Sequence, residues 1–186
     1  MNYKPLNKAL QHIRYPLPDK NSLLQRIAGN AIFSKFDLKS GFYQIGIDPK
    51  DRFKTTFVVP YGQYQWKVMP FGLANAPAEF QKRMEDIFRD LPWILVYIDD
   101  LLICSKNLQD HIRHLQEFYD RVFKHGLVLS KTKMEICKTE INFLGLKIRH
   151  GQVILQEHVL SVFSKFPDKL LEKVQLQHFR GSLNYI

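Results

Sequence analysis

Two adjacent acidic residues, Asp99 and Asp100, lie between two apolar stretches of the sequence. The stretches 94–97 and 101–104 each have the length and the β-branched content of a buried strand. The segment therefore predicts a tight hairpin that turns on the two acids. Two like charges at the tip of a buried hairpin repel each other, and a divalent cation is the natural compensation. A solvent-exposed acidic turn is the alternative, and the strongly apolar flanks count against it.

A third acidic residue, Asp37, ends an earlier apolar stretch that predicts a strand over residues 31–38. If this strand joins the same sheet as the hairpin, three carboxylates meet at neighbouring strand ends. Such an oxygen-rich site suits Mg²⁺ or Mn²⁺. Two such ions, about 3.5–4 Å apart, can clamp the attacking and leaving oxygens of a phosphoryl transfer. The spacing of the acids does not decide between a polymerase and a nuclease.

The elements that must position these acids predict an α+β fold, an antiparallel sheet with helices on one face. Hairpins are predicted over residues 53–68, turning near Tyr61 and Gly62, and over 141–155, turning at His150 and Gly151. A helix starting near Pro77 carries an apolar stripe of Phe80, Met84, Ile87, Phe88 and Leu91. A second helix, capped by Asn107 and ended by Gly126, carries a predicted buried stripe of Leu108, Ile112, Leu115, Tyr119, Val122 and Phe123.

Composition narrows the classes of partner. The 186 residues carry a net charge of +9, which favours a polyanionic partner such as nucleic acid. No run of 18 apolar residues is present, so no membrane span is expected.

The two cysteines, Cys104 and Cys137, lie in apolar segments and suggest buried, reduced thiols in an intracellular protein. His111 and His114 share a helix face but have no matching cysteine pair, which argues against zinc.

The chain resembles the reverse transcriptases of retroelements over essentially its whole length. Six segments carry the resemblance, in the family's order: Pro5-Leu6-Asn7-Lys8 with Tyr15-Pro16-Leu17-Pro18, Phe36-Asp37-Leu38-Lys39-Ser40-Gly41-Phe42, Met69-Pro70-Phe71-Gly72-Leu73 with Ala76-Pro77, Tyr97-Ile98-Asp99-Asp100, Asn142-Phe143-Leu144-Gly145-Leu146, and Gly181-Ser182-Leu183-Asn184-Tyr185. One such segment is weak evidence, and six in order are strong. Within the family the chain looks most similar to plant pararetroviruses of the bacilliform type and to Ty3-like retrotransposons.

The resemblance implies an RNA-directed and DNA-directed DNA polymerase that adds deoxynucleoside triphosphates (dNTPs) to a primer on an RNA or DNA template. Asp37, Asp99 and Asp100 would be catalytic and would bind two Mg²⁺ ions, with Mn²⁺ as a substitute and the Leu38 carbonyl as a further ligand. Ser40, Gly41, Phe42, Phe71 and Gly72 would contact the nucleotide; Pro77, Tyr97, Ile98, Leu144 and Gly145 would contact primer or template.

Two of these roles have an ordinary alternative. Phe42 falls at the family's steric gate against a ribose 2′-hydroxyl, although the residue by itself suggests a core aromatic. Lys131 or Lys133 falls near the family's mobile lysine, a candidate acid for the leaving pyrophosphate. A solvated or phosphate-neutralising lysine is an equal alternative at that position.

The resemblance also implies a domain organisation. Residues 1–30 would be partial fingers, 31–140 the palm with a fingers-side segment at about 45–70, 141–155 a primer-gripping hairpin, and 156–186 the start of the thumb. The triphosphate-binding fingers hairpin would lie before Met1, and the rest of the thumb and an RNase H domain beyond Ile186. The parent would be a polyprotein, located in the cytoplasm or in a viral particle.

Two further functions stay open. The chain could be a non-catalytic nucleic-acid-binding remnant of an integrated element, in which case it would bind nucleic acid without incorporating nucleotides. An RNA-dependent RNA polymerase is a weaker alternative, because those enzymes usually have Gly before the paired acids.

Arg180 departs from the apolar residue that the family usually has at its position, so the last helix is expected to pack imperfectly.

Overall fold

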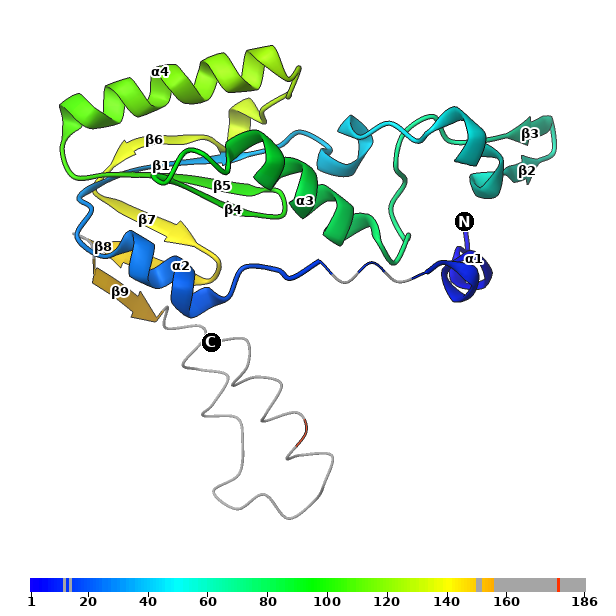
Figure 1. The fold of residues 1–186 in the computed structure, drawn as a ribbon, viewed down its shortest axis with the longest axis horizontal. Coiled ribbons are helices and arrows are strands. Elements are labelled where there is room, and N and C mark those ends of the chain that lie inside the picture. Colours follow the sequence, from blue (N-terminus) through cyan, green and yellow to red (C-terminus); the bar gives the residue numbers. More distant parts are fainter. Residues whose placement is uncertain (12, 14, 150–151, 156–176, 178–186) are drawn as a thin grey trace.

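The computed structural model describes residues 1–186 except for 12, 14, 150–151, 156–176 and 178–186. Its centre is an antiparallel sheet in the order β4-β5-β1-β6 (Figure 1). The strands are β1 (Ile32–Asp37), β4 (Ile94–Tyr97), β5 (Asp100–Ser105) and β6 (Glu135–Lys138). The predicted thumb segment 156–186 lies outside the described residues apart from Gln177. The antiparallel α+β arrangement that the sequence predicts is confirmed.

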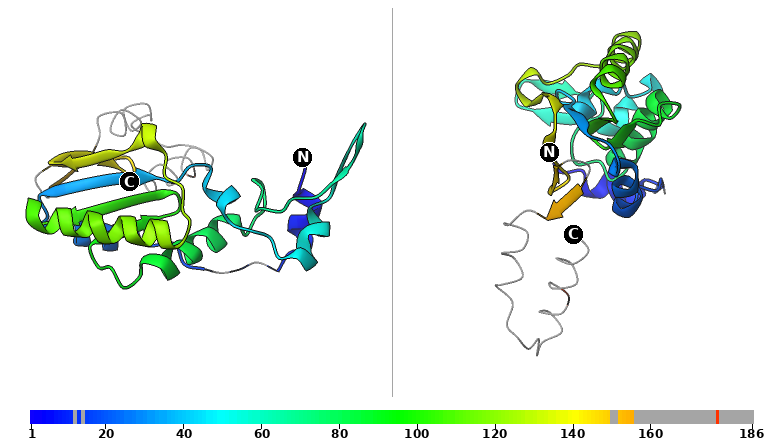
Figure 2. Two further views of the ribbon diagram at one scale, coloured as in Figure 1. Left: turned by 90° about the horizontal axis from the view of Figure 1, so that it is seen from above. Right: turned by 90° about the vertical axis from the view of Figure 1, so that its left-hand side faces the viewer.

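Two helices, α3 (Ala76–Phe88) and α4 (Leu108–Lys124), cover one face of this sheet, as the sequence predicts (Figure 2). The predicted stripe of α3 is buried, together with Phe36, Leu101 and Ile103 of the strands. Arg121 of α4 joins the two helices, because it pairs with Asp90 and also donates to the Ile87 carbonyl at 2.8 Å. This first core holds the acid-bearing strands against α3.

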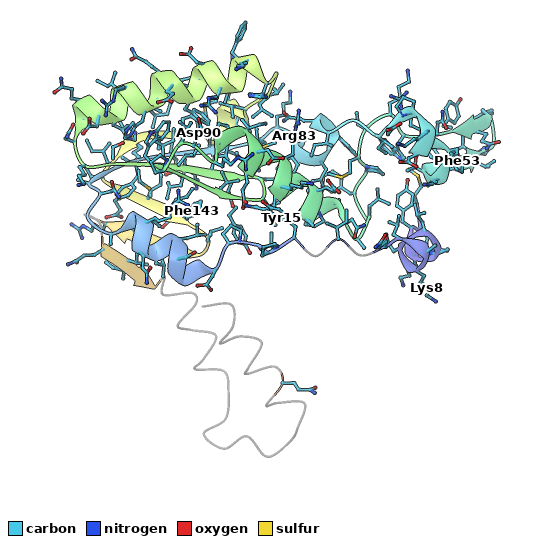
Figure 3. All side chains as sticks on the ribbon, in the orientation of Figure 1. Lys8, Tyr15, Phe53, Arg83, Asp90 and Phe143 are labelled. Atoms are coloured by element: carbon cyan, nitrogen blue, oxygen red, sulfur yellow. The ribbon has the colours of Figure 1, made fainter. Side chains whose placement is uncertain are left out.

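The other face of the sheet is also covered. Helix α2 (Lys20–Ile27) and a second antiparallel sheet pack there, with Phe33, Leu102 and Phe143 in the second core (Figure 3). The second sheet consists of β7 (Glu140–Phe143), β8 (Leu146–Arg149) and β9 (Gln152–Leu155). Because β1 and β5 carry apolar residues on both faces, burial on both sides is the expected outcome for them.

A separate group of elements extends away from the main sheet (Figure 2). It consists of α1 (Lys4–Ala9), the 3-10 helix η2 (Pro49–Thr55), and the hairpin β2 (Phe57–Val59) with β3 (Gly62–Tyr64). The 3-10 helix η1 (Gly41–Gln44) follows β1 and packs against the first core. The predicted hairpin is confirmed over its inner part, whereas its first residues belong to η2. Tyr15 ties the N-terminal segment to α3, since its hydroxyl donates to Glu85 Oε2 at 2.5 Å (Figure 3).

Three local predictions are wrong. The first strand of the predicted 141–155 hairpin turns at Leu144 and Gly145, whose φ angles of 50° and 78° break it into β7 and β8, while β8 pairs with β9 as the hairpin predicts. Strand β6 has no counterpart among the elements that the sequence predicts. Cys137 lies on this edge strand and is exposed, whereas Cys104 is buried as predicted.

Among the described helices, none is both long and apolar enough to span a bilayer.

The predicted buried stripe of α4 is wrong in part: Val122 is buried and Leu115 packs against the first core, but other members are exposed. Leu108, Ile112 and Phe123 are 52%, 49% and 89% exposed, and the helix instead buries His111 and Phe118 completely. The reason is a polar network. His111 Nε2 lies 2.7 Å from Ser34 Oγ, and its Nδ1 lies 2.8 Å from Ser105 Oγ. Because both ring nitrogens have partners, the histidine can be buried and the helix turns that side to the sheet.

The His111 network is expected to make stability depend on pH. Burial, with a smaller effect of His114, lowers the pKa of His111 from 6.5 to about 4. The unfolded imidazole therefore binds a proton that the folded one rejects, and stability is lost as the pH falls from 6.5 towards 4. In urea unfolding at pH 7 and 4.5, the wild-type chain is expected to lose about 2–3 kcal/mol more stability than His111→Gln.

The difference between the two proteins is the quantity to compare, because Asp99 and Asp100 act in the opposite direction. Their raised pKa values mean that the folded state holds their protons more tightly, so acid stabilises the fold through them. His125→Gln is the matched control, since it removes an exposed histidine from the same chain. A His111→Gln profile parallel to the wild-type profile contradicts the assignment.

Candidate functional site

The three acids meet at one end of the main sheet. The antiparallel register of β1 and β5 sets Asp37 opposite Asp100. Strands β4 and β5 close with Tyr97 opposite Asp100, so the loop between them consists of Ile98 and Asp99. The amide of Leu38 donates to the Asp99 carbonyl at 3.3 Å, which joins the end of β1 to this loop. The predicted hairpin is confirmed, with the correction that Asp100 is already part of β5.

Burial and mutual repulsion disfavour ionisation of two of the acids. The pKa of Asp99 is raised, first by burial and then by the charges of Asp37 and Asp100. The pKa of Asp100 is raised by burial and by Asp37. Lys133 acts against both shifts, and its Nζ lies 3.1 Å from Asp37 Oδ2. A cation placed among these carboxylates would therefore relieve a real electrostatic cost.

The donor set fits a hard divalent cation in its chemistry. All three side chains are carboxylates, and Asp99 Oδ1 is buried without a hydrogen-bond partner among the described residues. Buried ionised groups are either paired with an opposite charge or coordinate a metal ion. Within the described part of the chain, however, no three acidic, histidine or cysteine side chains stand close enough to form a complete metal site. The acids converge, and their side chains still have to close around an ion.

Gly41 makes room for Asp99. A Cβ atom at Gly41 would lie 2.0 Å from Asp99 Oδ1 and 3.1 Å from the Phe80 ring, so no other residue fits without moving one of them. The preceding Ser40 has a φ of 53°, in the left-handed region, which turns the chain sharply from β1 into η1. The segment 40–41 therefore places its backbone directly against the Asp99 carboxylate, and its predicted contact with phosphates stays a prediction.

An aromatic group follows Gly41. The Phe42 ring lies 5.2 Å from Phe71 and 5.5 Å from Phe80, measured between ring centroids. Phe71 is 54% exposed and precedes Gly72, whose φ is 94°. The structure thus brings the predicted nucleotide-contacting residues of both segments together. Phe42 is half-buried and packs against the first core, as the core-aromatic alternative expects, and its role as a gate stays a prediction.

The hairpin tip is held by a residue that the sequence analysis missed. The φ of Ile98 is 52°, an unusual and strained conformation for a β-branched residue. Gln81 of α3 is completely buried; its Oε1 accepts the Ile98 amide at 2.6 Å and its Nε2 donates to the Val96 carbonyl at 3.1 Å. A polar residue beside the apolar stripe of α3 was the available signal.

The remaining predicted site residues are the candidate primer and template contacts and the two candidate acids, Lys131 and Lys133. Leu144 and Gly145 form the β7–β8 turn, and Lys35 of β1 reaches this hairpin by donating to the Asn142 carbonyl at 3.0 Å. Pro77 lies in the first turn of α3, and Tyr97 packs against the second core. Of the two lysines, Lys133 contacts Asp37, while the exposed Lys131 forms no ion pair with any described residue.

Comparison with known proteins gives a consistent result. Residues 1–148 match the family described as "Reverse transcriptase (RNA-dependent DNA polymerase)". The chain is 46% identical over 186 residues to the enzymatic polyprotein of Cauliflower mosaic virus (strain Strasbourg), a plant pararetrovirus. The match includes 100% of this chain and 27% of that protein. It therefore spans about a quarter of the length of this relative.

The fold has close counterparts among solved structures. A foamy viral protease-reverse transcriptase in complex with double-stranded DNA matches with a TM-score of 0.85 and 23% identity, over 99% of this chain and 32% of that chain. The foamy viral enzyme in complex with an RNA/DNA hybrid matches with a TM-score of 0.80 and 23% identity, over 99% of this chain and 25% of that chain. At these identities the likeness concerns the fold.

Proposed function

This chain belongs to the reverse transcriptase family, and from that premise we propose that it is the polymerase part of a pararetroviral polyprotein. The reaction is the transfer of a deoxynucleotide from its triphosphate to the 3′ end of a primer, on an RNA or DNA template. The observation that carries the proposal is the register that sets Asp37 opposite Asp100, with Asp99 in the adjoining loop.

We assign Asp37, Asp99, Asp100 and the Leu38 carbonyl to hold two Mg²⁺ ions, for which Mn²⁺ can substitute. When bound, such ions supply charge stabilisation for an in-line displacement at phosphorus. The chain itself presents the carboxylates from adjacent strand ends, fixes the loop through Gln81, and buries Asp99 Oδ1. These are positioning and electrostatic contributions, which are the main means of catalysing phosphoryl transfer.

The nucleotide is proposed to lie between the acids and the aromatic group. The amides of Ser40 and Gly41 would face its phosphates, and Phe71 with Gly72 would line the base and sugar side. The ring of Phe42, held by Phe71 and Phe80, would occupy the space that a ribose 2′-hydroxyl needs. Lys133 is the better placed of the two candidate acids, because it already reaches Asp37.

Shortening Phe42 tests this arrangement. In the parent protein, Phe42→Val is expected to lower discrimination against ribonucleotides by about 10- to 200-fold, the range for one steric contact in a pocket. The measurement is kcat/KM for dCTP and CTP on the same primer–template. Phe57→Val is the control, since the Phe57 ring lies against Tyr64 and Trp66 in the β2–β3 region, and it should leave the ratio unchanged. An unchanged ratio in Phe42→Val removes the gate assignment.

The nucleic acid is proposed to cross the palm beside the second sheet. Leu144 and Gly145 would direct the primer strand, Ile98 and Tyr97 would approach its end, and Pro77 would lie near the template. The net charge of +9 supports a polyanionic partner, and the foamy viral relatives are complexes with double-stranded DNA and an RNA/DNA hybrid. Residues 1–30, 31–140, 141–155 and 156–186 would then serve as partial fingers, palm, primer grip and start of the thumb.

Primer extension tests the proposal as a whole. The parent protein, supplied with Mg²⁺, dNTPs and a DNA primer on an RNA template, is expected to extend the primer. Salt-sensitive binding of the template without any incorporation would favour the alternative of a nucleic-acid-binding remnant. Preferred incorporation of ribonucleotides would point to an RNA polymerase instead. The parent is expected to act in the cytoplasm or in a viral particle, and to include an RNase H domain.

A further inference from the structure

Backbone hydrogen bonds position Lys133, the lysine that forms an ion pair with Asp37. The amide of Ser130 donates to the Asp37 carbonyl at 2.8 Å, and the amide of Lys39 donates to the Val128 carbonyl at 2.9 Å. These two hydrogen bonds attach the segment that contains the short 3-10 helix η3 (Lys131–Lys133) to the end of β1. As a result, Lys133 Nζ lies 3.1 Å from Asp37 Oδ2, whereas Lys131 in the same turn remains exposed without an ion pair to any described residue.

The acid cluster has few positive charges to balance it. Three carboxylates meet at the tip, and two lysines approach them, Lys35 and Lys133. Lys35 is already engaged by Glu135 at 2.8 Å and by the Asn142 carbonyl. Lys133 is the cation that directly contacts one of the three acids. Its side chain is 64% exposed, so it can leave Asp37 without disturbing the core.

We propose that Lys133 is a resident counter-ion of the acid cluster, which a divalent cation must displace from Asp37. The inference rests on the proposed function, since it assumes that Asp37 is a metal ligand. Lysine and metal ion then compete for the same oxygen, Asp37 Oδ2. Metal binding releases the ammonium group at the moment when the acids close, so that Lys133 becomes free to face the substrate only when the ions are present.

Direct binding of Mn²⁺ to the 186-residue chain tests the competition. The dissociation constant is measured from the electron paramagnetic resonance signal of free Mn²⁺, without nucleotide or nucleic acid. Lys133→Met and Lys133→Gln are expected to bind Mn²⁺ about two- to fivefold more tightly, the range for a partly exposed ion pair. Lys133→Arg keeps the charge and is expected to bind like the wild type. Lys131→Met is the matched control and is expected to change nothing.

Thermal unfolding in EDTA gives a second readout. Without Lys133 the three carboxylates lose their counter-ion, so Lys133→Met is expected to melt a few degrees below the wild type and to gain more from added Mn²⁺. An unchanged or weaker Mn²⁺ affinity in Lys133→Met, with the wild type still binding, overturns the role of Lys133 alone. A wild-type chain that binds no Mn²⁺, or binds it equally well as Asp37→Asn, overturns the proposed metal site and the competition with it.

Discussion

Replacing Gly41 with alanine is expected to lower polymerase activity of the parent protein by about 100-fold or more, since displacements near 1 Å cost that much. The new Cβ would lie 2.0 Å from Asp99 Oδ1 and 2.9 Å from its Cγ. Side-chain atoms do not approach that closely, so the Asp99 carboxylate has to leave its position. Phe80 closes the other side at 3.1 Å and leaves the methyl group no alternative space. Steady-state primer extension measures the loss.

Gly46→Ala is the matched control for this substitution. Gly46 lies five residues further along the same segment, and a Cβ there would meet only the Lys67 carbonyl, at 4.0 Å. Activity is therefore expected to stay near the wild-type level. Circular dichroism of both variants shows whether the fold persists. A folded Gly41→Ala protein with wild-type activity would contradict the placement of Asp99 against this turn.

The location of the acids could be predicted from local patterns. Asp37 follows an apolar run, and Asp99 and Asp100 lie between two others. In an antiparallel sheet the end of one strand meets the start of its neighbour, so Asp37 at the end of β1 lies opposite Asp100 at the start of β5. The apolar patterns of these three strands are short and local, so the sequence was sufficient to locate them.

The orientation of α4 could not be predicted in the same way. Hydrophobic periodicity counts His111 as polar and places it outside, although the structure buries it. What decides its burial is Ser34, which lies 77 positions away and is itself buried on β1. Gln81 follows the same rule, since its partners are backbone atoms of β4 and its loop. Buried polar residues depend on distant partners, which no local pattern reveals.

The choice between Lys131 and Lys133 was equally hidden in the sequence. Both flank Thr132 in a short basic segment, and each has the reach to approach an acid. The backbone bond from Ser130 to Asp37 sets the direction of η3 and thereby selects Lys133. Such a bond forms only when the chain has returned to the end of β1, after the whole of α4.

Asp99→Asn is expected to separate activity from stability. An amide has nearly the same shape but no charge, so the loss of electrostatic stabilisation is expected to lower primer extension by about 1,000-fold. The folded protein is nevertheless expected to become more stable at pH 7. The raised pKa of Asp99 means that the buried, repelled carboxylate destabilises the native state wherever it is ionised. Primer extension and urea unfolding, performed on the same preparation, measure both effects.

The pairing of the two effects is what identifies Asp99 as a functional acid. A residue that only supports the fold loses activity because stability falls, whereas here activity falls while the unfolding midpoint rises. Asp120→Asn on α4 is the control, because Asp120 is exposed and far along the chain from the acids; it should change neither quantity appreciably. Activity that survives Asp99→Asn would remove the catalytic assignment. Inactivity with a lower unfolding midpoint would instead make Asp99 a structural residue of the β4–β5 hairpin.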